Sequence, residues 1–431
     1  MNDKSNSKQP VLILGVEPRI TIPIARSLHR YGVPVEAASL SSTEPQPGSR
    51  AIRNFTRLPE FSASSPEFIG ALETLIAERH YDTLIPATDA ALGAISHYDE
   101  RLRRIVELAC PAPEIVQRVL NKSLTLEIAK RAGIRIPGSF RATNLAELEA
   151  LRDKLQFPVV AKPYHKSSET DFKVRYFKSF EDLHRAMESD DQLGSRILLQ
   201  EYCPGDGVGV EMLIRNGEPI ATFQHRRLKE VPHTGGAAVL AVAETPDPEL
   251  VQQALTLLRA IEWEGVAMVE FRFHRPDRRL ALMEVNGRYW GTLSLPIQAG
   301  IDFPLYHWQV MHGETPVVPS QYAVGMIWRW SAGYVRRWHG VLAGSAKKAL
   351  RNPGVLKDLL PSWSDVSPFT RDSLWKVSDP APAALETLRS AFGLIGSDLS
   401  AIFRRVRKDG SGAPRQQAAV AMRVKQDAKE H

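Results

Sequence analysis

The sequence has 431 residues, of which 43% are hydrophobic and 24% are charged. This composition excludes a chain that is disordered throughout, a collagen-like fibre and a small disulfide scaffold, and the length is sufficient for two or three cores. The 55 Lys and Arg residues exceed the 49 Asp and Glu residues by a formal charge of only +6. That surplus is too small to argue for a nucleic-acid partner, and we expect none.

Cysteine usage and the N-terminus both favour a cytoplasmic protein. Only Cys110 and Cys203 are present, so one chain can build neither a disulfide framework nor a cysteine-based zinc site. Residues 1–10 are polar and lack the apolar core of a secretion signal, and no later stretch approaches about 18 uninterrupted apolar residues. We expect residues 1–10 and 408–431 to be disordered tails.

The first predicted elements are a strand over 11–14, a helix over 20–31 and a second strand over 33–38. Strand, helix and strand at this spacing predict a parallel, doubly wound α/β domain, to which residues 83–86 add a further strand. We place this domain at 11–113. Gly15 follows the first strand without the further glycines of a dinucleotide-binding loop, so a tight turn is the simpler interpretation.

A second unit begins with an apolar-periodic helix predicted over 114–132, followed by a helix over 145–155. Strands are predicted over 157–163, 197–202 and 208–214, and a hairpin over 266–273 and 280–285. Beyond about residue 319, five of the eight tryptophans stand among arginines and lysines. We interpret 320–407 as a mostly helical C-terminal extension.

The predicted hairpin carries Glu270 on one strand and Glu284 and Asn286 on the other, all within apolar surroundings. Residues 284 and 286 share one strand face, and strand pairing can bring the third side chain onto it. Two buried carboxylates repel each other unless a cation lies between them, and oxygen ligands favour magnesium. Salt bridges with the plentiful neighbouring arginines are an equally weighted alternative.

Two lysines are candidate phosphate contacts. Lys162 lies at the end of an apolar strand, where its ammonium group either pairs with an anion or loses its charge. A nucleotide phosphate could be that anion. Lys122 opens a helix after Asn121. Taken singly, each lysine is more often a solvated surface residue.

Residues 200–205 couple a strand to a Pro-Gly turn, and such a hinge can offer backbone groups to an adenine edge. Taken alone, this pattern predicts only a turn.

These pieces, in this order, resemble the ATP-grasp superfamily over residues 114–319, with a lid at about 134–200. The stretch 284–291, continuing to 299–304, is similar to predicted ATP-dependent carboligases related to carbamoyl-phosphate synthase and D-aspartate ligase. The resemblance implies ATP and Mg²⁺, or Mn²⁺, as cofactors and a preceding α/β domain that helps to form the substrate cleft. It also implies site residues by role: the ATP phosphates at Lys122 and Lys162, the adenine at Gln200, Glu201, Tyr202 and Cys203, magnesium at Glu270, Glu284 and Asn286, and the acyl-phosphate stage at Arg288.

Two positions depart from the pattern of the superfamily. The loop after Lys162, at 164–169, lacks the glycines that many relatives place over the phosphates. The acidic residue that many relatives use for the ribose falls near Gly207, which leaves Asp206 or Glu211 as substitutes.

The implied activity is a carboxylate–amine ligase. A carboxylate attacks the γ-phosphate of ATP, and an amine then displaces phosphate from the acyl phosphate while the lid excludes water. Residues 224–236 are basic and then glycine-rich, so Arg226, Arg227 and Lys229 are candidates for binding the acid or its phosphate. A solvated basic edge of a strand is an equally weighted alternative. His225 and His233 have no metal-ligand partner at helical spacing, and we interpret them as polar lining.

Four alternatives stay open. A bicarbonate-using carboxylase or carbamoyl-phosphate-forming enzyme would have the same frame, and so would a non-catalytic ATP-binding regulator. The segment 399–408 places apolar residues opposite arginines and a lysine, so it predicts either packing against the protein or peripheral contact with an anionic membrane. The fourth alternative is that the protein forms a homodimer.

Overall fold

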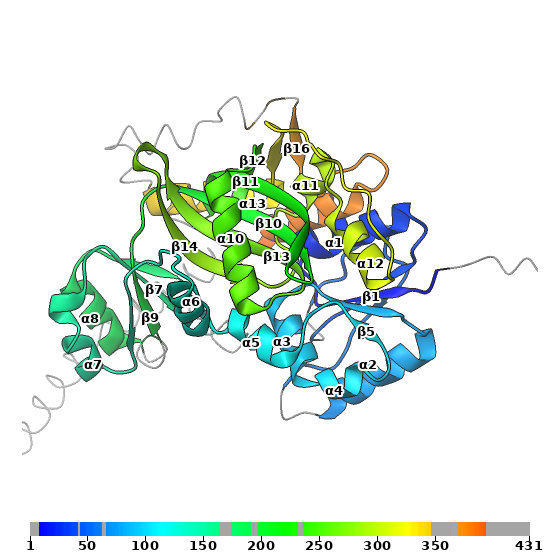
Figure 1. Cartoon of the computed structure of the whole chain (residues 1–431), viewed down its shortest axis with the longest axis horizontal. Coiled ribbons are helices and arrows are strands. Elements are labelled where there is room, and N and C mark those ends of the chain that lie inside the picture. Colours follow the sequence, from blue (N-terminus) through cyan, green and yellow to red (C-terminus); the bar gives the residue numbers. More distant parts are fainter. Residues whose placement is uncertain are drawn as a thin grey trace, which may run out of the picture.

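The computed structural model describes residues 8–41, 44–62, 66–163, 174–190, 193, 197–231, 236–345, 365, 367 and 369–393. The described residues form three β-sheets, with helices packed around them (Figure 1). The predicted loop 164–169, His233, the amphipathic segment 399–408 and the C-terminal tail lie outside the described residues, as do the first seven residues.

The first sheet has the strand order β3-β2-β1-β4-β5, and all of its strand pairs are parallel. Its strands are β1 (Val11–Leu14), β2 (Val35–Ala38), β3 (Phe55–Thr56), β4 (Thr83–Pro86) and β5 (Glu107–Leu108). The helices that follow in the chain are α1 (Pro18–Arg30), α2 (Pro66–Arg79), α3 (Asp89–His97) and α4 (Asp99–Leu102). The doubly wound arrangement predicted from the sequence is confirmed. Since the strand order reverses between β1 and β4, the loops after these strands flank the switch point of the sheet.

The helix predicted over 114–132 is two helices, α5 (Pro113–Leu120) and α6 (Lys122–Arg131). Asn121 separates them with an extended backbone, and its side chain accepts hydrogen bonds from the backbone N–H groups of Ser123 and Leu124. An asparagine at this position satisfies donors that a helix start leaves free, so it begins a new helix rather than continuing the old one. Lys122 is therefore the first residue of α6.

A four-stranded sheet with the order β6-β9-β7-β8 forms a separate layer with its own core. Its strands are β6 (Ser139–Ala142), β7 (Val159–Pro163), β8 (Arg175–Phe177) and β9 (Ile197–Glu201), with helices α7 (Leu145–Glu149) and α8 (Phe180–Ser189). The helix predicted over 145–155 thus ends early, and a short 3₁₀ turn, Arg152–Lys154, replaces its last part. Figure 1 shows this layer at one end of the molecule.

The largest sheet has seven strands in the order β14-β13-β10-β11-β12-β15-β16. These strands are β10 (Asp206–Arg215), β11 (Glu218–Val231), β12 (Ala237–Glu244), β13 (Gly265–His274), β14 (Arg279–Asn286), β15 (Ile327–Arg329) and β16 (Thr370–Asp372). One face packs on α10 (Pro248–Ile261), because Val208, Val210 and Met212 alternate inward along β10 and join its core. The opposite face therefore carries Gly207, Gly209 and Glu211.

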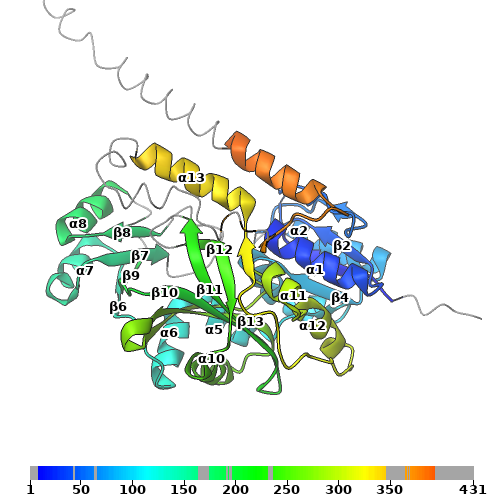
Figure 2. The same ribbon diagram turned by 90° about the horizontal axis from the view of Figure 1, so that it is seen from above.

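The C-terminal region contributes both helices and strands. β15 pairs with β12 and β16 pairs with β15, so this region extends the largest sheet. Helix α13 (Ser331–Ser345) and a helix over 381–393 run along one side of the molecule (Figure 2). Helices α11 (Ser294–Ala299) and α12 (Phe303–Met311) pack against α1 in a second core. Among the helices of the described residues, none combines the length and the apolar character that crossing a membrane would require.

Candidate active site

A pocket of about 520 Å³ is lined by strand residues of the four-stranded and the seven-stranded sheet and by the segments that follow β1 and β4 of the first sheet. Most of the side chains that the sequence singled out are on its wall. The predicted site residues that line it are Lys122, Lys162, Gln200, Glu201, Tyr202, Cys203, Glu270, Glu284, Asn286 and Arg288.

The two lysines approach the pocket from different elements. Lys162 comes from β7, and its ammonium donates to the side-chain oxygen of Gln200 at 2.6 Å. Burial, together with the nearby charge of Lys122, lowers the pKa of Lys162 to about 8. Lys122, at the start of α6, lies 3.5 Å from the Glu284 carboxylate. Two cationic side chains on one wall make that wall suitable for a polyanion.

The three oxygen-bearing side chains of the β13–β14 hairpin are together. Glu270 and Glu284 are direct partners across the antiparallel pair, and Asn286 is opposite Met268 in the next position on the same face. The Asn286 amide donates to Glu270 Oε1 at 3.0 Å. The Arg227 guanidinium lies 2.5 Å from Glu270 Oε2, so a cationic side chain contacts each carboxylate.

The chemistry of this donor set fits a divalent cation of the magnesium type. Arg227 and Lys122 already compensate the two carboxylates, as the salt-bridge alternative predicts, and the carboxylate oxygens are also the ligands that Mg²⁺ prefers. Within the described residues, no group of three His, Cys, Asp or Glu side chains could hold a metal ion. A third protein ligand at this position would be the amide oxygen of Asn286, beside the two carboxylates.

The strand end at 200–203 forms another part of the wall. Gln200 is buried between Lys162 and the Ser139 hydroxyl, to which its amide donates at 3.2 Å. The backbone N–H groups of Glu201 and Tyr202 donate to carbonyl oxygens of neighbouring segments. No contact among the described residues engages the N–H of Cys203, which leaves this group as a donor at the pocket edge.

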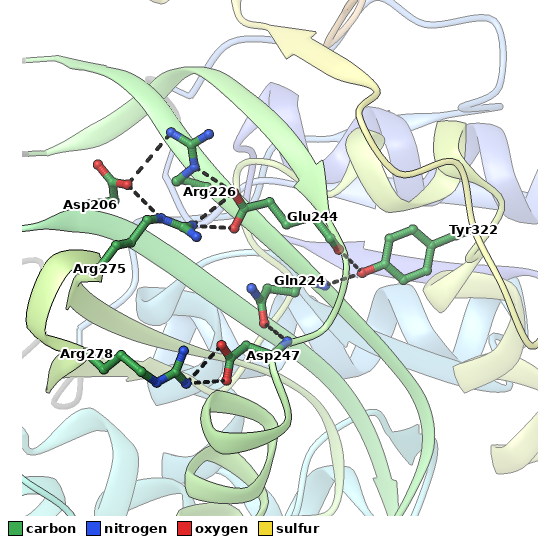
Figure 3. Close-up of polar contacts among 8 residues, drawn as sticks. All are labelled: Asp206, Gln224, Arg226, Glu244, Asp247, Arg275, Arg278 and Tyr322. Atoms are coloured by element: carbon green, nitrogen blue, oxygen red, sulfur yellow. Dashed lines mark hydrogen bonds and ion pairs between the residues drawn. The ribbon is translucent and has the colours of Figure 1, made fainter.

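Asp206 does not line the pocket, although the sequence made it a candidate for the ribose. Consecutive strand residues point to opposite faces, so Asp206 lies on the face away from the neighbouring Gly207. Its carboxylate lies 3.1 Å from Arg275 and 3.7 Å from Arg226, within the polar network of Figure 3. Glu211 is on the pocket side of β10, but it is fully buried against His225 at 2.5 Å.

Of the three basic residues proposed to bind the acid, only Arg227 lines the pocket. Arg226 pairs with Glu244 at 2.6 Å on the opposite face (Figure 3), and Lys229 pairs with Asp365 at 2.5 Å. Burial would lower the pKa of Arg227, but the Glu270 and Glu230 carboxylates raise it above its usual value. Arg227 is thus held as a permanent cation beside Glu270.

Arg288 lies at the far end of the pocket, beside the first domain. Its guanidinium donates to Asp89 at 2.8 Å and to the carbonyl oxygen of its neighbour Tyr289. Burial would lower the pKa of Arg288, but the Asp89 carboxylate holds it above its usual value. The pocket therefore extends from the Cys203 hinge, past both lysines and the paired glutamates, to the loops of the first sheet.

Comparisons with known proteins agree with this geometry. Residues 194–331 match the family described as "ATP-grasp in the biosynthetic pathway with Ter operon". This part of the chain is therefore similar to the ATP-grasp family. The matched segment contains the hinge, the β13–β14 hairpin and Arg288, whereas both lysines precede it.

Similarity to individual proteins is distant and covers only part of each chain. The N-terminal section of the carbamoyl phosphate synthase large chain from Methanopyrus kandleri is 23% identical over 218 residues, covering 48% of this chain and 37% of that protein. D-alanine–D-alanine ligase A from Bacillus cereus is 26% identical over 107 residues, covering 25% of this chain and 35% of that protein. This chain therefore spans well under two thirds of the length of these relatives.

Solved structures share the ATP-grasp fold. L-amino acid ligase from Bacillus licheniformis superposes with a TM-score of 0.57 at 19% identity, covering 71% of this chain and 74% of that one. The ADP complex of N5-carboxyaminoimidazole ribonucleotide synthetase gives a TM-score of 0.59 at 15% identity, covering 73% and 79%.

Part of the pocket wall comes from the loops after β1 and β4, as the expected contribution of the preceding α/β domain to the cleft implies, but the sequence did not single out the residues concerned. Glu17 and Arg19 follow β1, and Thr88 and Asp89 follow β4, and all four line the pocket. Their position in the sequence could have indicated this role. Polar residues that follow the carboxyl ends of two strands beside a switch point commonly meet a ligand.

Proposed function

We propose that this protein is an ATP-dependent ligase that activates a carboxylate as an acyl phosphate and joins it to an amine. The observation that carries the proposal is the single pocket in which both lysines, the paired glutamates and Arg288 face one another. Each of these groups suits one part of a reaction that moves a phosphoryl group between anions.

The nucleotide would lie along the wall formed by β7, β9 and α6. The adenine edge would meet the N–H of Cys203, and the phosphates would reach Lys162 and Lys122. Lys162 is held by Gln200 at 2.6 Å, which directs its ammonium along the wall before any nucleotide binds. Pre-positioned cations stabilise a triphosphate without the cost of ordering them at the moment of reaction.

Glu270, Glu284 and Asn286 would hold the Mg²⁺ ion, which when bound supplies positive charge to neutralise the phosphate oxygens. Arg227 contributes a second, fixed charge to the same place, because its guanidinium lies against Glu270. Glu230 and the carbonyl oxygen of Gly236 hold this guanidinium from the other side, at 3.4 and 3.0 Å.

The reaction has two steps. A carboxylate oxygen of the acid attacks the γ-phosphorus of ATP, the bond to the β–γ bridging oxygen breaks, and ADP leaves. The amine then attacks the acyl carbon, the bond from that carbon to the phosphate oxygen breaks, and phosphate and the proton of the amine are released. Arg288 is placed to hold the phosphoryl oxygens between the steps, with Asp89 fixing its orientation at 2.8 Å.

For the domain organisation we propose 11–113 for the first α/β domain and 114–319 for the ATP-grasp domain, with the lid at about 134–200. The four-stranded sheet falls within that lid. The region 320–407 would be an extension that braces the largest sheet through β15 and β16.

The test is an ADP-release screen of the full chain with Mg·ATP against amino acids, peptides, hydroxy acids and bicarbonate. We expect release that depends on an organic acid and an amine, and a loss of at least 100-fold in the Glu284→Gln variant. The matched control is Glu249→Gln, which removes an exposed partner of Arg278 and leaves the pocket untouched. Substrate-dependent release that survives Glu284→Gln would refute the metal assignment, and release with bicarbonate alone would establish the carboxylase alternative.

A further inference from the structure

The end of the pocket beside Arg288 is built where the first sheet reverses its strand order. The loops after β1 and β4 begin α1 and α3, and both helices start at the pocket wall. Crevices at such switch points bind ligands in open parallel sheets, because two loops diverge there and leave space between them.

This end of the pocket contains charges of both signs. Glu17 pairs with Arg19 at 2.8 Å, and Asp89 pairs with Arg288 at 2.8 Å. The contacts among the described residues engage only Oε1 of Glu17, and this side chain is the most exposed of the four at 32%. The wall therefore presents a carboxylate oxygen to whatever occupies the space.

Arg19 is not a mobile cation that could turn towards a ligand. Its guanidinium carbon lies 3.8 Å from the ring centre of Trp330, and the indole N–H of Trp330 donates to Glu386 at 3.0 Å. Burial would raise the pKa of Glu17, but the charge and hydrogen bonds of Arg19 lower it below its usual value. Glu17 consequently stays ionised in the neutral pH range.

A second set of groups at this end consists of donors. The residues Arg288, Trp290 and Thr292 line the pocket. Within the described residues, Arg288 Nε, Trp290 Nε1 and the Thr292 hydroxyl are buried and have no hydrogen-bond partner. Trp290 is completely buried and Thr292 is 5% exposed. Because a buried donor without an acceptor costs free energy, this cluster is prepared for an anionic ligand.

We propose that the acid activated by this enzyme is an amino acid, bound as a zwitterion. Its carboxylate lies against the donors of Arg288, Trp290 and Thr292, close to the paired glutamates and the phosphates. Its ammonium group lies towards Glu17, on the side of the first domain. This inference rests on the proposed ligase function and narrows it to one substrate class.

The charges discriminate against the other candidate acids. Bicarbonate or an N-acylated acid would bring an anion to the donors and no donor to Oε2 of Glu17, the carboxylate oxygen that Arg19 does not contact. A zwitterion satisfies the donors with one end and Glu17 with the other. Glu17 is therefore a specificity residue for the ammonium group, and it takes no part in bond making.

The test replaces the unknown amine by hydroxylamine, which converts any acyl phosphate into a coloured hydroxamate. The acids are the 20 common L-amino acids and, as matched controls, their N-acetyl derivatives and bicarbonate. We expect hydroxamate from one or more free amino acids and at least tenfold less from the corresponding N-acetyl derivative. Equal rates with and without the free ammonium group would overturn the inference while leaving the ligase proposal intact. No hydroxamate and no ADP release from any acid would overturn both.

Glu17→Gln provides the second arm. Glutamine retains an oxygen that can accept the N–H of Arg19, so α1 keeps its cap while the negative charge is lost. We expect the KM for the amino acid to rise at least tenfold with the KM for ATP unchanged. The control is Glu73→Gln, which removes a comparable Glu–Arg pair on the surface at α2. Equal KM values for the amino acid in Glu17→Gln and the wild type would contradict the assignment of Glu17.

Discussion

The Arg227 guanidinium crosses the surface of β10 to reach Glu270 on the next strand, at 2.5 Å. It can do so because the residue beneath it is Gly207, where an added Cβ would lie 3.0 Å from Arg227 Cδ. The protein thus keeps a cation of its own beside the carboxylate that we assign to the metal. Charge at this position is balanced before a metal ion or a nucleotide arrives.

Removing that cation makes the fold dependent on a metal ion. For Arg227→Met in EDTA we expect the free energy of unfolding to fall by about 3 kcal/mol, because a partly buried carboxylate loses its partner. Mg²⁺ should restore part of this loss, since binding to the folded state stabilises it. Urea unfolding with and without Mg²⁺ measures both effects. Arg226→Met, on the opposite face, is the control, and an equal loss without Mg²⁺ rescue in both variants would contradict the assignment.

The pKa of Lys162, at about 8, predicts a pH dependence of nucleotide binding. The affinity for a non-hydrolysable ATP analogue should fall above pH 8, by up to tenfold per pH unit, because the lysine loses its proton. In the Lys162→Met variant, affinity should be lower and independent of pH in this range. Calorimetric titration between pH 7 and 9.5 measures this, and an equal slope in the variant would exclude Lys162 from the phosphate site.

The lowered pKa of Lys162 also affects the stability of the fold, which should rise with pH where nucleotide affinity falls. Between pH 8 and 10.5 the unfolded chain holds the Lys162 proton more tightly than the folded protein does. The contribution of Lys162 to the free energy of unfolding therefore rises with pH in this window. Comparing urea unfolding of wild type and Lys162→Met across these pH values isolates that contribution.

Gly209 makes room for the buried pair behind the metal ligands. A Cβ at this position would overlap the His225 ring, which Glu211 holds at 2.5 Å inside the sheet. We expect Gly209→Ala to lower the free energy of unfolding by about 2 kcal/mol. Gly70→Ala is the matched control, because Gly70 lies in α2 with open space around it, and alanine should be neutral or stabilising there. Equal effects at both positions would show that His225 can move aside freely.

The raised pKa of Glu386, in the helix over 381–393, predicts that the stability of the fold depends on pH. Burial, with the negative charge of Glu17, raises the pKa of Glu386 from 4.5 to about 7. The folded protein therefore binds this proton more tightly than the unfolded chain, and the contribution to stability is lost as the pH rises from 4.5 through 7. This loss in the free energy of unfolding amounts to about 3 kcal/mol. Unfolding measured from pH 4.5 to 8 should show this slope in the wild type and not in Glu386→Gln, and parallel curves would contradict it.

Local sequence spacing was sufficient to predict which side chains of the β13–β14 hairpin lie together. The spacing of Glu284 and Asn286 puts both on one strand face, and the hairpin turn between the two strands fixes Glu270 opposite Glu284. The parallel first sheet followed from strand and helix spacing in the same way. These features depend on residues that are near one another in the sequence.

Long-range contacts account for what the sequence did not predict. The sequence alone does not distinguish the roles of the neighbouring residues Arg226 and Arg227. The strand register shows that Arg226 faces Glu244 and that Arg227 faces Glu270. Asp206 also lies outside the pocket because the strand register turns its side chain to the opposite face of the sheet. Glu17 and Arg288 are separated by most of the chain, so their meeting at one pocket end depends on how the domains pack.

The pairing of β15 with β12 has a practical consequence for trimming the chain. A truncated protein that stops near residue 320 would uncover the backbone N–H and C=O groups of β12 that now pair with β15, at residues 240–242. Exposed strand edges recruit strands from other molecules and promote aggregation. Shortened versions intended for expression or crystallisation should therefore retain the sequence through β16.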